Sequence, residues 1–221
     1  AGLKALRVLD NVERTLATPV QIEAALESAR LVQRVWRNVT MPERAAILSR
    51  FCDAFASHGD AIAEELSWQM GRPLRYAPSE VRGTLERARH MIAIAPAALA
   101  DIDVGPKAGF HRFLRREPLG VVFTVAAWNY PYLIAVNSVV PALMAGNVVV
   151  LKHSAQTPLC AERFEECLRE AGLPEGAFQT LHLSHADTER VIRNPRVDFV
   201  SLTGSVAGGH AVQQATADRL I

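Results

Sequence analysis

The sequence has no excess of either charge, and this excludes the partners that charge would recruit. Its 24 lysines and arginines are interleaved with 23 aspartates and glutamates, which leaves a formal net charge of +1 over 221 residues. Nucleic acids and anionic membrane surfaces bind proteins through clustered basic side chains. Because no such cluster is present, we expect neither a nucleic acid nor a membrane as a partner.

Cysteine is scarce, and its number and spacing argue against a disulfide-stabilised protein and against a cysteine-bound metal site. Cys52, Cys160 and Cys167 are odd in number and form no CxxC pair. We therefore expect no disulfide framework and no metal site, and we predict a reducing, cytoplasmic location. Free cysteine is among the most buried residue types, so the three are interpreted as small core residues.

Long apolar segments and a common phosphate-binding motif are also missing. No run approaches the roughly 20 apolar residues that span a bilayer, and the first residues lack the apolar core of a signal peptide. No strand is followed by G-x-G-x-x-G, the usual dinucleotide-binding fingerprint. A dinucleotide site, if present, must therefore use another kind of turn.

Capping signals predict helices through most of the first hundred residues. Thr18-Pro19-Val20-Gln21 and Thr40-Met41-Pro42-Glu43 each combine a cap, a proline and a side-chain acceptor three residues after the cap. Two more helices are expected over about 60–70 and 79–100. Residues 101–118 then change character, and Phe110 to Arg116 alternate as an exposed edge strand that needs a partner.

From Gly120 onward, apolar strands alternate with helices. Strands are expected near 121–126, 147–151, 178–182 and 197–202, and helices near 132–144, 157–171, 185–193 and from about 205. Continuous apolar strands separated by helices are typical of a parallel sheet covered on both faces. We therefore predict an α/β fold with a Rossmann-like parallel sheet, preceded by a helical region.

Polar residues stand where three of these strands end. Asn129 follows the first strand, Lys152 the second, and Thr203-Gly204-Ser205 the last. In open α/β sheets, ligands bind at this carboxyl edge. Each residue alone also has a purely structural interpretation: Asn129 as a turn residue, Lys152 as a solvated lysine and Ser205 as a helix cap.

Taken together, the motifs resemble those of the aldehyde dehydrogenase superfamily. The matching segments are E-P-L-G-V (117–121), A-W-N-Y-P (127–131), P-A-L-M-A-G-N (141–147), L-K-H-S-A-Q-T-P (151–158), A-G-L-P-E-G (171–176) and L-T-G-S (202–205). The resemblance divides the chain into a helical part of the cofactor-binding domain (1–104), an oligomerisation strand or hairpin (105–118) and a Rossmann-like core (119–221). It implies a homodimer or homotetramer that oxidises an aldehyde with NAD or NADP.

The resemblance also implies roles for individual residues. Asn129 would stabilise the oxyanion formed from the aldehyde, and Lys152 would bind the adenosine ribose. The residues expected at the cofactor are Ala127, Trp128, Lys152, Ser154, Ala155, Ser184, Thr203, Gly204, Ser205 and Gly209.

Two groups of the resembled family are absent from these residues. Its nucleophilic cysteine lies in a Q-x-C context and its general base in E-L-G-G, and neither motif occurs. We therefore expect this chain alone to be inactive, and its missing half to cover apolar surface near residues 121–145. The alternative is a cofactor-binding or interaction module without turnover.

The sequence differs from the pattern of the resembled family at two places that concern the cofactor site. NAD-preferring members often carry glutamate three residues after the strand-end lysine, where this sequence has Ala155, so we expect NADP to be accepted as well as NAD. Where many members have a glycine-rich turn, Ser184 is expected to cap a helix instead. The segments F-Q-T-L, L-K-H-S and T-G-S-V-A-G-G resemble a bacterial branch that includes succinate-semialdehyde-like dehydrogenases.

Overall fold

A four-stranded parallel sheet forms the centre of the computed structural model, which describes residues 5–8 and 12–219. Its strand order is β7-β6-β5-β8, so the direction of winding reverses between β5 and β8. This confirms the predicted α/β fold. The strands are β5 (Val121–Val125), β6 (Val148–Lys152), β7 (Phe178–Thr180) and β8 (Phe199–Leu202).

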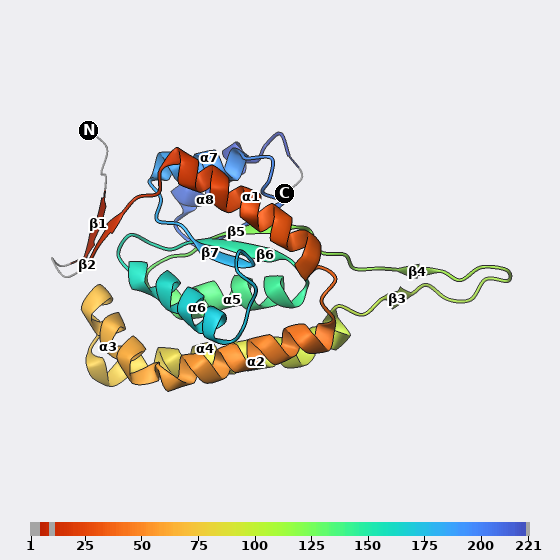
Figure 1. Ribbon diagram of the computed structural model, residues 1–221, viewed down its shortest axis with the longest axis horizontal. Helices are drawn as coiled ribbons and strands as arrows, with labels where there is room; N and C mark the ends of the chain where they lie inside the picture. The colour runs from red at the N-terminus through yellow and green to blue at the C-terminus, as the bar shows by residue number, and fades with distance from the viewer. Residues whose placement is uncertain (1–4, 9–11, 220–221) are drawn as a thin grey trace.

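Helices cover both faces of the sheet, as predicted (Figure 1). On one face lie α1 (Pro19–Trp36), α7 (His185–Arg193) and α8 (Val206–Ala215). On the other lie α5 (Pro131–Met144) and α6 (Pro158–Glu170). A further layer outside these two contains α2 (Met41–Ser57) and α4 (Ala77–Ala98), joined by α3 (Gly59–Met70) and η1 (Leu74–Tyr76).

Local signals account for most helix ends. The Thr18 and Thr40 capping boxes are both formed, each with the expected side-chain acceptor three residues later. Gly71 adopts the left-handed conformation that ends α3. These caps satisfy backbone groups that a helix end leaves without partners.

The extra helical layer changes one expectation about the core. Val121 to Phe123 of β5 are buried, and so is most of α5, because α5 packs against the sheet on one side and α4 on the other. The expectation of an exposed apolar surface near residues 121–145 is therefore wrong for β5 and for α5. Only Trp128 and Tyr130, on the turn between them, are exposed large hydrophobic residues of that range.

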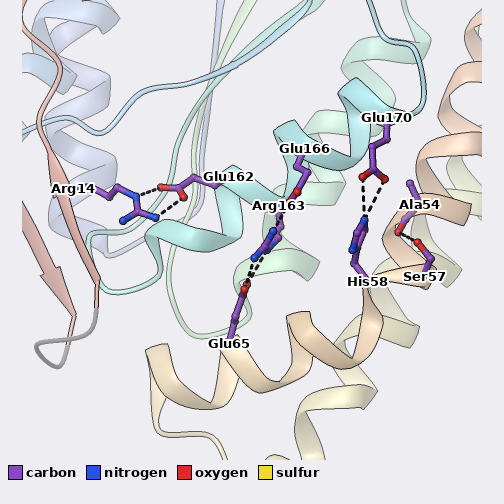
Figure 2. Close-up of polar contacts among 9 residues, drawn as sticks. All are labelled: Arg14, Ala54, Ser57, His58, Glu65, Glu162, Arg163, Glu166 and Glu170. Atoms are coloured by element: carbon purple, nitrogen blue, oxygen red, sulfur yellow. Dashed lines mark hydrogen bonds and ion pairs between the residues drawn. The ribbon is translucent and has the colours of Figure 1, made fainter.

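A short hairpin replaces helix at the start of the described chain. β1 (Ala5–Val8) pairs antiparallel with β2 (Val12–Thr15), although the first hundred residues were expected to be helical. The β-branched residues Val12 and Thr15 favour strand over helix. Arg14 then donates to Glu162 of α6 at 2.7 Å, which fastens β2 to the body of the protein (Figure 2).

Ion pairs of the same kind join α6 to the outer helical layer (Figure 2). Arg163 of α6 donates to Glu65 of α3 at 3.0 Å, and His58 lies 3.1 Å from Glu170. These pairs are partly exposed, so each contributes roughly 0–1 kcal/mol. Their role is to set the position of α6 rather than to supply most of the stability.

A second hairpin extends away from the body of the protein (Figure 1). β3 (Ile102–Asp103) pairs antiparallel with β4 (Phe113–Leu114). The strand expected over 110–116 is therefore only two residues long, and its partner lies in the same chain. Ile102, Phe110 and Leu114 are exposed on this hairpin.

Gly120 tests the packing at the start of β5, and Gly209 in α8 serves as a matched control. Gly120 has a φ of 136°, and a Cβ there would overlap the Asp198 carboxylate, which accepts from the Val121 amide at 2.8 Å. We expect Gly120→Ala to lower the free energy of unfolding by about 3 kcal/mol. Gly209→Ala, in α8 with nothing within 4 Å of its Cβ, is expected to raise it by about 0.5–1 kcal/mol. Urea unfolding followed by circular dichroism measures both, and equal effects would contradict the account.

Candidate functional site

Strand register brings three of the predicted polar segments to one edge of the sheet. Val125 of β5 is paired with Lys152 of β6 on one side and with Leu202 of β8 on the other. The Thr203 amide donates to the Val125 carbonyl at 3.0 Å, and the Ala126 amide donates to the Lys152 carbonyl at 3.1 Å. The carboxyl ends of β5, β6 and β8 therefore meet where the strand order reverses, the usual position of a ligand in such sheets.

A cleft of about 970 Å³ opens at this edge. Its walls include Asn129 and most of the residues expected at the cofactor, namely Ala127, Trp128, Lys152, Ser154, Thr203, Gly204 and Ser205. Helices α7 and α8 form the opposite wall. The sheet edge and this helix pair thus place residues from four separate segments around one space.

Three of the expected cofactor residues lie outside the cleft wall. Ala155 is exposed on the turn after β6. Ser184 caps α7, where its hydroxyl accepts from the Asp187 amide at 3.0 Å, and this confirms the predicted cap. Gly209 lies within α8, whereas its neighbour Gly208 lines the cleft.

Lys152 is the most deeply buried charged residue that lines the cleft. Only 8% of it is exposed, and among the residues the structure describes no carboxylate or hydrogen-bond acceptor pairs with its ammonium group. Burial lowers the pKa of Lys152 below its ordinary value. Lys152 is therefore a strand-end lysine whose side chain is largely buried and whose ammonium group opens onto the cleft.

The start of α8 faces the same cleft. Ser205 is the cap, and its hydroxyl accepts from the Gly208 amide at 3.1 Å, so the interpretation as a helix cap is confirmed. Gly204, before the cap, is exposed and has no side chain between its backbone and the cleft. A helix start of this kind offers backbone amides and a positive dipole end to an anionic group.

Sequence reasoning missed the wall formed by the helices. His185, Thr188, Glu189 and Ile192 of α7 line the cleft, together with Ala207, Gly208, Ala211 and Val212 of α8. The spacing of three to four residues places each set on one side of its helix. That periodicity was visible in the sequence, but it does not show which side faces a ligand.

His153 was also missed, and it joins two segments of the site. Its Nδ1 accepts from the Ser154 amide and the Thr157 hydroxyl, both at 2.9 Å. Because an amide can only donate, Nε2 must carry the proton, and it donates to the Pro131 carbonyl at 3.2 Å. A neutral, buried imidazole thus ties the turn after β6 to the start of α5.

None of the three cysteines is suited to act as a nucleophile. All are buried and free, as expected from the sequence. Burial raises the pKa of Cys52 to about 11 and of Cys167 to about 12, and it raises that of Cys160 well above its ordinary value. The reactive form of cysteine is the thiolate, which these environments disfavour.

Residues 5–8 and 12–219 contain neither a metal-binding cluster nor a membrane-spanning helix. No group of three or more His, Cys, Asp or Glu residues is arranged to hold a metal ion there. No helix in that part of the chain is long and apolar enough to cross a bilayer.

Comparison with known proteins identifies the family and the fold. A family model described as the aldehyde dehydrogenase family matches residues 9–221. This chain belongs to that family. Its fold is shared with the succinic semialdehyde dehydrogenase of Streptococcus pyogenes, solved with NADP+, at a TM-score of 0.87 and 28% identity, over 96% of this chain and 47% of that one.

Curated members of the aldehyde dehydrogenase family are similar in sequence as well. Succinate-semialdehyde dehydrogenase [NADP(+)] of Mycobacterium avium is 34% identical over 93% of this chain and 44% of its own length. Betaine aldehyde dehydrogenase of Agrobacterium fabrum is 36% identical over 92% of this chain and 41% of its own length. The chain therefore spans less than half the length of these relatives.

His153 predicts a pH dependence of stability. Burial lowers the pKa of His153 to about 4 from the 6.5 of an unfolded histidine. Between these values the unfolded chain binds more protons, so stability is complete above pH 6.5 and is lost as the pH falls toward 4. This group alone is expected to remove about 2 kcal/mol between pH 7 and pH 5.

The measurement compares urea unfolding at pH 7 and pH 5 for the unmodified protein and for His153→Gln. We expect the difference between the two pH values to be smaller by about 2 kcal/mol in the variant. His90→Gln, at an exposed histidine of α4, serves as the control. An unchanged difference in His153→Gln would show that the ring is not held neutral.

Proposed function

We propose that this chain is the cofactor-binding part of an NAD(P)-dependent aldehyde dehydrogenase whose full-length product oxidises an aldehyde to a carboxylic acid. The observation that carries the proposal is Lys152, a largely buried lysine whose ammonium group opens onto the cleft with no partner among the described residues. An ammonium group in this position is available to a ligand group that accepts its hydrogen bonds. The hydroxyl groups of a ribose or a phosphate oxygen would do so.

The rest of the cleft fits a dinucleotide. Gly204 leaves the backbone open, and the start of α8 offers amides to a phosphate. Lys152 and Ser154 would hold the ribose and its substituents, and Thr203, Gly204 and Ser205 would line the path toward the nicotinamide. When bound, the nicotinamide supplies the hydride acceptor for the oxidation.

Asn129 is proposed as the donor to the reacting carbonyl. It is exposed at the end of the turn after β5 and lines the same cleft as Lys152. A side-chain amide that donates to a developing oxyanion stabilises it most when the donor is already in place. Ala127 and Trp128, on the same turn, form the cleft wall beside it.

The nucleophile and the general base are not found among these residues. All three cysteines are buried, and no E-L-G-G motif is present. We therefore propose that the 221 residues alone do not turn over aldehyde. Because the thiols are free and buried, we also retain a cytoplasmic location as part of the proposal.

A homodimer or homotetramer is proposed from the projecting hairpin. Phe110 and Leu114 are 65% and 58% exposed on an arm that extends away from the body (Figure 1). Exposed apolar side chains on a short strand favour pairing with another sheet edge. A second copy of the chain would supply that edge.

Substitution of Lys152 in the full-length product tests the cofactor site. Lys152→Met removes the ammonium, and loss of a charged hydrogen bond is expected to weaken NADP binding by roughly 10-fold to 100-fold. Arg34→Met, an exposed change on α1, is the control. Binding measured by fluorescence titration that is equal in both variants would contradict the proposed site.

Substitution of Ala155 tests whether the protein accepts NADP as well as NAD. No carboxylate stands at this position to repel the 2′-phosphate, and the Mycobacterium avium relative is named for NADP. We expect steady NADPH formation from succinate semialdehyde by the full-length product. Ala155→Glu should raise the KM for NADP by about 10-fold, because the added carboxylate would repel the 2′-phosphate. Good turnover with NAD beside none with NADP in the unmodified enzyme would overturn this part.

A further inference from the structure

The segment from Asn129 to the first turn of α5 is held by other parts of the protein at four consecutive residues. Arg72 Nη2 donates to the Asn129 carbonyl at 3.3 Å, and the Arg72 guanidinium carbon lies 5.0 Å from the centre of the Tyr130 ring. The Pro131 carbonyl accepts from His153 at 3.2 Å, and the Tyr132 amide donates to Glu80 at 3.0 Å.

Glu80 of α4 takes the place of a missing cap on α5. Tyr130, the residue at the cap position of α5, makes no side-chain capping bond. The first amides of a helix need acceptors, and a carboxylate there also interacts well with the helix dipole. Glu80 is 1% exposed, and its Oε1 accepts from the Tyr132 amide. The cap of α5 is thus supplied by a different helix.

Arg72 connects this cap to Asn129. Its Nη1 pairs with the second carboxylate oxygen of Glu80, while its Nη2 reaches the Asn129 carbonyl. The planar guanidinium is suited to such a bridge because its donors keep a fixed geometry. Arg72 follows Gly71, whose left-handed conformation turns the chain at the end of α3.

We propose that Arg72 and Glu80 are positioning residues that fix the Asn129 amide for the reaction. The proposal rests on the proposed role of Asn129 and extends it to the outer helical layer. A buried ion pair is by itself weak evidence for stability. Here Arg72 also donates to the Asn129 carbonyl, and Glu80 accepts from the first turn of α5, so the pair links the position of α4 to that of Asn129.

A double-mutant cycle in the full-length enzyme tests the proposal. Asn129→Ala is expected to lower kcat by roughly 100-fold to 1,000-fold, as for loss of an oxyanion donor. Glu80→Gln is expected to lower kcat by about 10-fold, because a misplaced donor stabilises the oxyanion less, while the Kd for NADP stays within about twofold. In the double variant, kcat should equal that of Asn129→Ala within about twofold. The Arg72–Glu80 pair, which we call the clamp, then has no side-chain amide to position.

Two further variants separate positioning from general damage. Arg72→Met should lower kcat as Glu80→Gln does, and Arg72→Lys, which keeps the charge beside Glu80, should restore part of it. Glu166→Gln removes an acidic partner of an arginine, Arg163, within α6, away from the Arg72–Glu80 pair, and should leave kcat unchanged (Figure 2). If Glu80→Gln does not fold, the cycle is run with Arg72→Lys in its place.

The outcomes distinguish failure of the clamp from failure of the proposed function. A native kcat in Asn129→Ala would reject the role of Asn129 itself. If Asn129→Ala is impaired, a native kcat in both Glu80→Gln and Arg72→Met would overturn the clamp. Effects that multiply in the double variant would also overturn it, because they would show that Glu80 acts independently of Asn129.

Discussion

β5 is hydrogen-bonded to β6 on one side and to β8 on the other, and the position of the cleft depends on these two ladders. The register sets Lys152 and Leu202 beside Val125, so the turns that follow all three strands open at one place. A shift of one residue in either ladder would turn the strand's side chains to the other face. The site is therefore a consequence of strand pairing more than of any single side chain.

Burial then determines the charge of the groups at this edge. Lys152 and His153 are neighbours at the end of β6, yet they differ in role. His153 satisfies both ring nitrogens within the protein and stays neutral, whereas the Lys152 ammonium faces the cleft without a partner among the described residues. His153 therefore holds the turn after β6 against the start of α5, whereas Lys152 is free to bind a ligand.

Some of this could be predicted from the sequence, because strand ends and caps are local signals. Asn129, Lys152 and Ser205 follow apolar runs whose end points are readable, and parallel strands bring such ends together. Arg72 and Glu80 could not be found in this way, since they lie about 50 residues before the turn that they hold. Their contact depends on how the outer helical layer packs on α5, which no local pattern records.

Hydrogen–deuterium exchange of the full-length protein with and without NADP+ tests the central claim, that one dinucleotide site is built from the ends of β5, β6 and β8. We expect NADP+ to slow amide exchange in peptides covering residues 125–130, 152–156 and 202–209 together. The β3–β4 hairpin should be unaffected. Protection confined to other segments, or absent from all three strand ends at saturating NADP+, would contradict the account.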